Sequence, residues 1–432
     1  MKEFDRRGRR CCGIIRGFVL SFSILSFAAA LWCSSLLKNN EVATVAERSL
    51  AAASEEESSS RRSLRVVAPQ QLPIKVFILV GQSNMQGHGY VNEKNSKTKK
   101  YLNGTLEWMV ETFPEKYGKL KNFQNESSSW KERDDVWIAY NKQSYKGDNS
   151  TQYRINKHGK LIPGYGGDPW DRNHMGPELG FGWTVGDEFG SKDGKKQQIL
   201  LLKIAWGGKS LAVDFRPPSS GGTTGVYYNA TMTAIDKTIE ILPQLFSDYE
   251  DGYYDWKGDG TTTKEDAQFG NYEIAGFAWH QGFNDMLHDH CAEEYEFNLA
   301  NLIRDVRTHL KVPDLPFVIG ASGMGGWKSK KEKKLWTTST NSTADTVTPP
   351  RTRTNKVIFA QFRVSNPEGE FAGTVKTVET RDFFRPPYPK GSPDKQGYHW
   401  NNNCESYWLI GKAMGEAMVE LIRNGRDGEG SI

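Results

Sequence analysis

This sequence has few cysteines, a small net charge and no apparent internal repeat. Only five of its 432 residues are cysteines, and only Cys291 and Cys404 follow residue 72. That part of the chain can therefore form one internal disulfide at most. The formal net charge is +4 and includes an N-terminal arginine cluster, so nothing indicates a nucleic-acid partner. No internal repeat is apparent, which gives no sign of a repeat architecture.

The N-terminus combines a basic segment with an uncharged apolar run from Gly17 to Leu37. A signal-peptide core spans about 7–15 residues, whereas a membrane-spanning helix needs roughly 20. Length therefore favours a single-pass type II anchor, with residues 1–16 in the cytoplasm and 17–37 in the membrane. The rest of the chain would then lie in the secretory-pathway lumen or outside the cell. The alternatives are secretion after cleavage near Ala30 and an organelle transit segment.

Residues 38–72 are expected to form a disordered stalk, because they contain runs of Glu, Ser and Arg and almost no aromatic residues. A single folded domain is expected over residues 73–424. Five Asn-x-Ser/Thr acceptors support a glycoprotein of the secretory pathway. They lie at Asn103, Asn125, Asn149, Asn229 and Asn341.

The folded part alternates apolar strands with amphipathic helices, which predicts a parallel sheet covered on both faces, a three-layer α/β/α sandwich. Strands are expected at 76–80, 198–205, 274–279 and 317–321. Helices are expected at 177–188, 230–245, 293–310 and 406–421. Residues 93–170 and 325–350 look inserted, because both are polar and interrupt this alternation.

The first strand runs directly into Gly81-Gln82-Ser83-Asn84-Met85. At the carboxyl edge of a parallel sheet, such a turn presents a hydroxyl where α/β proteins bind their ligands. Met85 replaces the second glycine of the Gly-x-Ser-x-Gly elbow, which disfavours the α/β-hydrolases. The alternative is an ordinary strand-end turn.

Two later segments place polar groups at comparable positions. The strand at 274–279 leads into Gly282-Phe283-Asn284-Asp285, and His399 lies just before the last helix. Serine, asparagine and histidine of this kind suit a nucleophile, an oxyanion donor and a base.

The chain resembles the sialate O-acetylesterase / carbohydrate esterase family 6 domain of the SGNH-hydrolase superfamily. The resemblance rests on the segments Gly81–Met85 and Trp279–Asp285 and on His399. The resemblance extends from about Ile74 to Met418. It implies a flavodoxin-like sheet and a serine esterase that removes O-acetyl groups from acetylated polysaccharide or a sialic-acid-like sugar through an acyl-enzyme. It implies no cofactor. Further matching blocks are Gly176–Leu179, Lys203–Gly208 and Val378–Arg381.

The resemblance assigns Ser83 as nucleophile and His399 as general base, since imidazole titrates near neutrality. The oxyanion donors would be the amides of Ser83 and Gly208 and the side chain of Asn284. Gly207 and Gly208 cannot be distinguished from sequence. Either Gln281 or Asp285 would orient this group.

The sequence departs from the family pattern three residues before the histidine. SGNH hydrolases usually have Asp-x-x-His, but this position is Gln396. A glutamine carbonyl can accept the Nδ1 proton but cannot stabilise imidazolium by charge. The site is then a Ser–His dyad, or Asp394 or another carboxylate completes a triad. A carbohydrate-binding pseudoenzyme is the alternative function.

Two further expectations concern the cysteines. Cys291 and Cys404 follow the two proposed site loops, so a disulfide between them is one alternative and two free thiols the other. Cys291 also ends a cluster of His280, His288, Asp289 and His290. Its spacing matches no standard zinc pattern, and no metal is expected.

Overall fold

The computed structural model describes residues 72–122, 129–141, 157–168, 171–192, 195–245, 272–340 and 352–429. The predicted basic tail and membrane span, and all but the last residue of the stalk, lie outside the described residues. Among the described residues, no helix has both the length and the apolarity needed to cross a bilayer.

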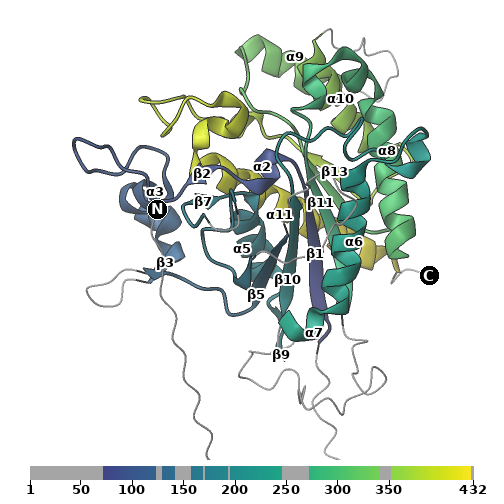
Figure 1. Cartoon of the computed structure of the whole chain (residues 1–432), viewed down its shortest axis with the longest axis horizontal. Coiled ribbons are helices and arrows are strands. Elements are labelled where there is room, and N and C mark those ends of the chain that lie inside the picture. Colours follow the sequence, from purple (N-terminus) through teal and green to yellow (C-terminus); the bar gives the residue numbers. More distant parts are fainter. Residues whose placement is uncertain are drawn as a thin grey trace, which may run out of the picture. The chain divides into compact units, whose positions relative to one another are not determined.

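A seven-stranded sheet lies at the centre of the folded unit (Figure 1). Its order is β13-β12-β11-β1-β10-β5-β6, and every neighbouring pair is parallel except β5 and β6. The strands are β1 (Ile74–Gly81), β5 (Val136–Asn141), β6 (Lys157–Lys160), β10 (Ile199–Ala205), β11 (Tyr272–His280), β12 (Phe317–Gly320) and β13 (Val375–Val378).

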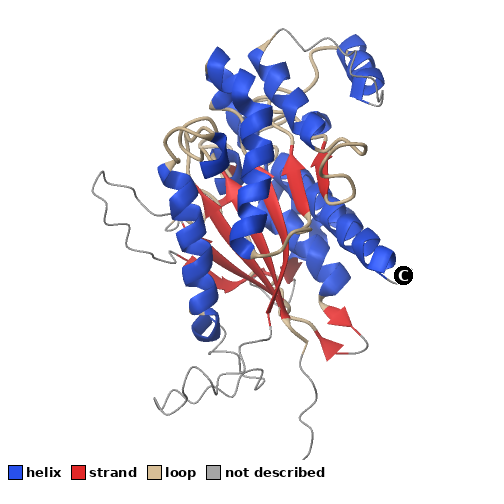
Figure 2. Ribbon diagram, turned by 90° about the vertical axis from the view of Figure 1, so that its right-hand side faces the viewer, coloured by secondary structure: helices blue, strands red, loops and turns tan. Residues whose placement is uncertain are grey.

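Both faces of the sheet are buried, because successive side chains of a strand point to opposite sides. In β1, Val76 and Ile78 belong to one hydrophobic cluster, and Phe77 and Leu79 belong to the other. The first cluster includes residues of α6 (Val226–Glu240), α8 (Asp289–Leu310) and α10 (Arg353–Val364). The second includes residues of α5 (Pro177–Phe189) and α11 (Cys404–Glu429). The predicted three layers are therefore present (Figure 2).

Five strands keep the flavodoxin-like order that the resemblance implied. Numbered among themselves along the chain, β1, β10, β11, β12 and β13 lie in the order 2-1-3-4-5, as in flavodoxin. The strands β5 and β6 extend this sheet at the edge beyond β10, because β10 pairs with both β1 and β5. Gly81, at the end of β1, is level with Ala205 of β10 and His280 of β11. These three strands therefore end at the same edge.

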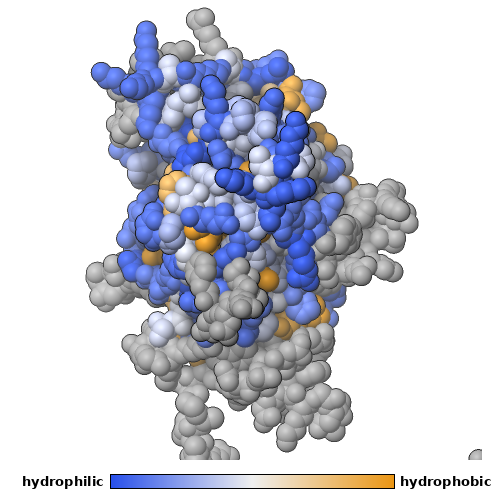
Figure 3. Space-filling model, turned by 90° about the vertical axis from the view of Figure 1, so that its left-hand side faces the viewer, coloured by the Kyte–Doolittle hydropathy of each residue, from blue (hydrophilic) through white to orange (hydrophobic). Residues whose placement is uncertain are grey.

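The predicted insertion at 93–170 is partly wrong, because this stretch supplies β5 and β6 to the central sheet. The stretch 325–350 contains α9 (Lys330–Thr340), and residues 341–350 lie outside the described part. The remaining helices and strands are α2 (Ser83–Gln86), β2 (Gly89–Tyr90), α3 (Leu106–Thr112), α4 (Pro114–Tyr117), β3 (Lys121–Asn122), β4 (Ser129–Trp130), β7 (His174–Met175), β8 (Ser191–Lys192), β9 (Lys195–Lys196) and α7 (Leu242–Leu245). On the face drawn in Figure 3, the described residues are mostly hydrophilic, with small separate hydrophobic areas.

The two described cysteines are free, so the disulfide that we considered is absent. Cys404 begins α11 on one face of the sheet, and its thiol donates to the Tyr90 carbonyl over 2.9 Å. Cys291 lies in α8 on the other face, with its sulfur 3.2 Å from His290 Nε2. The sheet lies between the helices that carry the two thiols.

Candidate active site

The candidate site forms where β1, β10 and β11 end. The Trp206 amide donates to the Gly81 carbonyl over 3.2 Å, and the Gln82 amide donates to the His280 carbonyl over 3.4 Å. A Cβ atom built on Gly81 would lie 2.2 Å from the His280 carbonyl oxygen. Glycine is needed here because the two strand ends approach so closely. Ser83, the first residue of α2, follows this contact and is 8% exposed.

Polar contacts connect the Ser83 turn to the His399 loop. Asn84 Nδ2 donates to the Tyr398 carbonyl over 3.0 Å. The Tyr407 hydroxyl, from α11, lies 3.0 Å from Asn84 Oδ1 and 3.3 Å from the His399 carbonyl oxygen. Among the described residues, no hydrogen bond joins the Ser83 hydroxyl to the His399 ring. Such catalytic bonds often tighten only in the substrate complex.

The other side of the His399 ring contacts the residue that replaces the expected acid. His399 Nδ1 lies 3.2 Å from Gln396 Oε1, and Gln396 Nε2 lies 3.0 Å from Asp394 Oδ2. Because the amide nitrogen of Gln396 must donate to the carboxylate, its oxygen is left to accept the Nδ1 proton. Nε2 of His399 therefore carries the lone pair that a general base needs.

A second histidine, His88, stacks on His399. The ring centroids are 3.9 Å apart and the planes differ by 6°. Burial lowers the pKa of His399 to about 4; the Asp394 carboxylate opposes this shift and the charge of His174 adds to it. The imidazole is therefore mostly neutral, and able to accept a proton, above about pH 5.

The backbone after His399 has an unusual conformation. Trp400, Asn401 and Asn402 all have positive φ, at 56°, 54° and 57°, which is rare for a residue as large as tryptophan. Side-chain bonds hold this segment: Asn401 Nδ2 donates to the Arg385 carbonyl over 3.0 Å. Such strain persists only where the surroundings fix the backbone.

The structure brings together the two residues predicted as oxyanion donors, Gly208 and Asn284. Asn284 Nδ2 donates to the Gly208 carbonyl over 2.8 Å, and Gly208 has φ +70°. Within the described part of the chain, the amides of Ser83 and Gly208 have no acceptor. Gly207 is close too, since a Cβ atom built on it would lie 3.8 Å from Ser83 Cβ.

Gln82, which the sequence analysis did not identify, links the Ser83 turn to the loop after β11. Its Oε1 accepts from the amides of Gly282 and Asn284 and from Gln281 Nε2, each over 3.2 Å. Its Nε2 donates to Asn284 Oδ1 over 3.3 Å. The only sequence signal was its position beside Ser83.

Both residues predicted to orient this group, Gln281 and Asp285, do contact it. Gln281 Nε2 donates to Asp285 Oδ2 over 2.6 Å. Asp285 also accepts from the amides of Leu211 and Ala212, over 2.8 and 2.9 Å, and so fixes the loop after β10. Burial raises the pKa of Asp285 to about 6, although these donors favour the ionised form.

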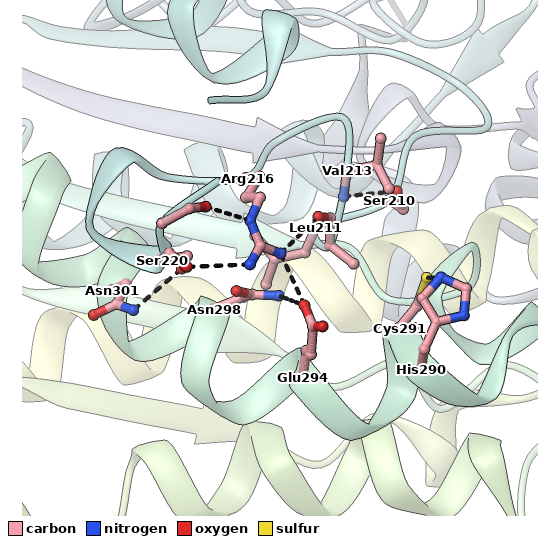
Figure 4. A network of polar contacts seen from close by, with 12 residues as sticks. Ser210, Leu211, Val213, Arg216, Ser220, His290, Cys291, Glu294, Asn298 and Asn301 are labelled. Carbon is pink, nitrogen blue, oxygen red and sulfur yellow. Dashed lines mark hydrogen bonds and ion pairs between the residues drawn. The ribbon is translucent and has the colours of Figure 1, made fainter. Parts of the chain in front are cut away.

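The loop after β10 has a second anchor at Arg216 (Figure 4). The guanidinium donates to Glu294 Oε2 on α8 over 2.8 Å and to the carbonyls of Ala212 and Ser220 over 3.0 and 3.1 Å. The loop that carries Gly208 is thus held at two points, Asp285 and Arg216. This provides the fixed geometry that an oxyanion site needs.

A buried ion pair between Lys203 and Glu178 lies next to α2, the helix that begins at Ser83. Lys203 Nζ, on β10, lies 2.7 Å from Glu178 Oε2 and also donates to the carbonyls of Gln86 and Tyr165 over 2.7 and 2.8 Å. The lysine is 0% exposed. Because Gln86 ends α2, this lysine fixes the end of the four-residue helix that begins at Ser83.

The histidine and cysteine cluster around His280 does not converge on one point. His280 is fully buried and its Nδ1 lies 2.9 Å from the Gly320 carbonyl oxygen, whereas His290 contacts Cys291 (Figure 4). In the described ranges, no group of three or more His, Cys, Asp or Glu residues could hold a metal ion.

Comparisons with known proteins identify a family. The chain matches the family described as carbohydrate esterase, sialic acid-specific acetylesterase, over residues 73–245 and 255–357. It is 39% identical over 64 residues to a probable carbohydrate esterase from Arabidopsis thaliana, which is 15% of this chain and 24% of that protein. The chain thus spans about a quarter of the length of this curated relative.

Two solved structures are similar at lower identity. One, of an Arabidopsis thaliana protein, has 18% identity and a TM-score of 0.43, covering 80% of this chain and 98% of that one. The other, a carbohydrate acetylesterase from Xanthomonas citri, has 12% identity and a TM-score of 0.39, covering 79% of this chain and 56% of that one.

Proposed function

Because this chain belongs to the carbohydrate esterase family described as sialic acid-specific acetylesterases, we propose that it is a serine esterase that removes O-acetyl groups from carbohydrates. The observation that carries the proposal is the pair of contacts from Asn84 and Tyr407 to the His399 loop. They hold the loop of the base against the turn of the nucleophile. The substrate is an acetylated polysaccharide or a sialic-acid-like sugar.

In the first half of the reaction, Ser83 Oγ attacks the acetyl carbonyl carbon while His399 Nε2 takes the hydroxyl proton. The carbonyl oxygen becomes an oxyanion that the amides of Ser83 and Gly208 and the Asn284 side chain stabilise. Each such donor is worth about 3 kcal/mol in a water-excluded site. Asn284 Nδ2 uses one hydrogen on the Gly208 carbonyl, which leaves its second hydrogen for the substrate.

Collapse of this intermediate breaks the ester C–O bond, and the sugar oxygen leaves with the proton from His399. In the second half, His399 takes a proton from water and the resulting hydroxide attacks the carbonyl carbon of the acetyl-serine. The bond from this carbon to Ser83 Oγ then breaks, and Oγ takes the proton back from His399. Acetate and free Ser83 are the products, and no cofactor or metal takes part. Gln396 holds the Nδ1–H of His399 throughout, so the imidazole keeps one tautomer.

Replacement of Ser83 by alanine tests this proposal. Ser83→Ala should abolish hydrolysis of a nitrophenyl acetate, acetylated xylan and O-acetylated sialic acid, with an unchanged circular dichroism spectrum, because only the attacking oxygen is lost. Ser365→Ala, at the end of α10, is the matched control and should keep full activity. Wild-type turnover by Ser83→Ala would refute the nucleophile. Hydrolysis of the aryl ester without any sugar ester would refute the substrate class.

Gln396 supports one second candidate, a carbohydrate-binding protein without turnover. Its neutral side chain occupies the place of the expected acid and cannot stabilise imidazolium by charge. This candidate predicts that the wild-type protein binds an acetylated saccharide but releases no acetate from it. Acetate release that Ser83→Ala removes would exclude it.

We retain the N-terminal anchor as a proposal. An apolar run of this length, preceded by six basic residues, supports insertion with the esterase domain on the lumenal or extracellular side. The full-length chain should stay with membranes after alkaline carbonate extraction, and an endoglycosidase should lower its mass. A soluble secreted form that begins near Leu31 would show a cleaved signal instead.

A further inference from the structure

A groove of about 380 Å³ lies beside the loop that carries His399. One wall is a hairpin-like segment between β2 and α3, and the other is the segment that precedes Gln396. The lining residues are Glu93, Lys94, Asn95, Ser96, Leu102, Tyr388, Pro393, Asp394 and Lys395. The volume falls in the range of roughly 300–1,000 Å³ that is typical of small-molecule sites.

Hydrogen bonds within the chain hold both walls of the groove in place. Asn95 Oδ1 accepts from the amides of Lys97 and Thr98, over 2.9 and 3.0 Å, and so closes the first wall into a tight turn. In the second wall, the Tyr388 amide donates to the Asp394 carbonyl over 2.8 Å. The Asp394 amide donates to the Asn401 carbonyl over 3.2 Å. The groove is therefore preformed, which lowers the entropy cost of binding.

The chemistry of the lining suits a neutral polyhydroxylated ligand. Two carboxylates, Glu93 and Asp394, are balanced by two amines, Lys94 and Lys395, so the walls have no net charge to select an anion. The Tyr388 side chain is 39% exposed, and its ring offers a flat apolar surface with a polar tip. Charged and hydroxyl groups around one aromatic face are what a neutral sugar ring needs.

One residue belongs to both the groove and the candidate site. Asp394 lines the groove, and its carboxylate lies 3.0 Å from Gln396 Nε2, which in turn places Gln396 Oε1 against His399. We propose that this groove is a subsite for a neutral sugar unit of an acetylated oligosaccharide or polysaccharide, distinct from the unit that carries the ester. The inference rests on the proposed function and narrows its substrate to a saccharide chain rather than a single sugar.

The test compares substrates of increasing length. For the wild type, kcat/KM should rise from acetylated methyl xyloside to acetylated xylan oligosaccharides. Tyr388→Ala should lower kcat/KM on the oligosaccharides about three- to tenfold, since stacking on one ring is lost, and leave nitrophenyl acetate hydrolysis unchanged. Tyr388→Phe keeps the ring and should retain the length dependence. Tyr272→Ala is the matched control. Tyr272 is similarly exposed, at 37%, but it begins β11, whereas the candidate site lies where this strand ends.

Binding provides a readout that does not need catalysis. The Ser83→Ala protein, titrated calorimetrically with an unacetylated xylan oligosaccharide, should bind it, and the Ser83→Ala/Tyr388→Ala protein should bind it at least threefold more weakly. Equal affinity of the two proteins, or no binding, would overturn the subsite. If the wild type does not hydrolyse nitrophenyl acetate at all, the proposed esterase mechanism is refuted instead. Failure of the subsite and failure of the proposed function are therefore distinguishable.

Discussion

Gln396 determines how the imidazole of His399 is held, because its carbonyl is the acceptor for Nδ1. A carboxylate at this position would orient the ring and also stabilise its positive charge. Glutamine can only orient it, and here Asp394 fixes the glutamine in turn. The charge is thus present but one side chain further from the imidazole than in a Ser–His–Asp triad.

Substitutions of these two residues should separate orientation from charge. Gln396→Ala should lower kcat roughly ten- to hundredfold with little change in KM, less than the about 10⁴-fold loss when a protease triad acid becomes its amide. Asp394→Asn, which can still accept from Gln396, should cost less than Asp394→Ala. Steady-state kinetics on a nitrophenyl acetate would measure both. A loss for Asp394→Ala as large as for Ser83→Ala would mean that the carboxylate contacts His399 directly.

The lowered pKa of His399 predicts an unusual pH profile. As the proposed base, His399 must be neutral to accept a proton, and its pKa is about 4 instead of about 6.5. As pH falls from 7, kcat/KM should therefore stay level to about pH 5 and reach half its value near pH 4. His88→Phe keeps a stacked ring and should preserve this limb. A half-maximal point at pH 6.5 would contradict the burial of the imidazole.

Buried histidines and Asp285 change the stability of the fold in opposite directions as pH falls. The pH experiment must therefore include a control for unfolding. His280 and His399 both have folded-state pKa values of about 4, so protonation of the unfolded chain below about pH 6.5 favours unfolding. The pKa of Asp285 is raised to about 6, so its protonation favours the folded state as pH falls through this value. Circular dichroism at each pH would separate unfolding from loss of the base.

Sequence was sufficient for residues that end strands and insufficient for residues that act through distant partners. Ser83 and Asn284 follow apolar strands, and glycines mark both turns, so their positions could be predicted. His88 and Tyr407 could not, because their roles depend on contacts with His399 and Asn84 across the fold. No local pattern distinguishes a stacking histidine from any other.

At the scale of single elements, α2 depends on interactions outside itself. A helix of four residues has too few internal hydrogen bonds to be stable alone. Lys203 and Glu178 supply the missing stabilisation. The lysine is fully buried, pairs with Glu178, and donates to the carbonyl of Gln86, the residue that ends α2. The position of Ser83 therefore depends on β10 and α5.

Breaking this ion pair should destabilise the protein and disturb the site. Lys203→Met leaves Glu178 buried without its cation, which typically costs about 3–5 kcal/mol of unfolding free energy. Urea unfolding would measure the change. Lys412→Met, in the exposed pair with Glu416, is the control and should cost less than about 1 kcal/mol. Equal effects for the two variants would show that Lys203 does not support α2.

Elements were predictable from sequence where their pattern was long and were missed where it was short or interrupted. The bounds of α5 and α8 were expected to within four residues, whereas α11 continues to Glu429, eight residues beyond its expected end. β5 was missed because its six residues lie within a long polar stretch. Its burial comes from pairing with β10, which composition cannot reveal.

For the whole molecule, the sequence predicted the layers, and the resemblance implied the order of β10, β1, β11 and β12. Alternating strands and helices favour a parallel sheet. The addition of β5 and β6 beyond β10 could not be predicted, because it depends on long-range strand pairing. The pairing of β10 with β1 places the Gly208 loop beside Ser83.

The same layering predicts how the protein responds to reductant. Cys291 and Cys404 lie in α8 and α11, which pack on opposite faces of the sheet, and both thiols are free. Dithiothreitol should therefore leave the Tm of the purified esterase domain unchanged. Alkylation after unfolding, followed by peptide mass spectrometry, should modify both cysteines without prior reduction. A linked pair of peptides would contradict this packing.

Asn84 and Tyr398, the residues that join the Ser83 turn to the His399 loop, are 314 positions apart in the chain. A ribosome completes the first of them long before the second exists. The Ser83 turn is therefore synthesised before the His399 loop, and the proposed Ser–His pair can form only after α11 has packed against α5. A nonsense mutation that removes only the last helix and its preceding loop should leave most of the sheet sequence intact and yet yield a product with no activity.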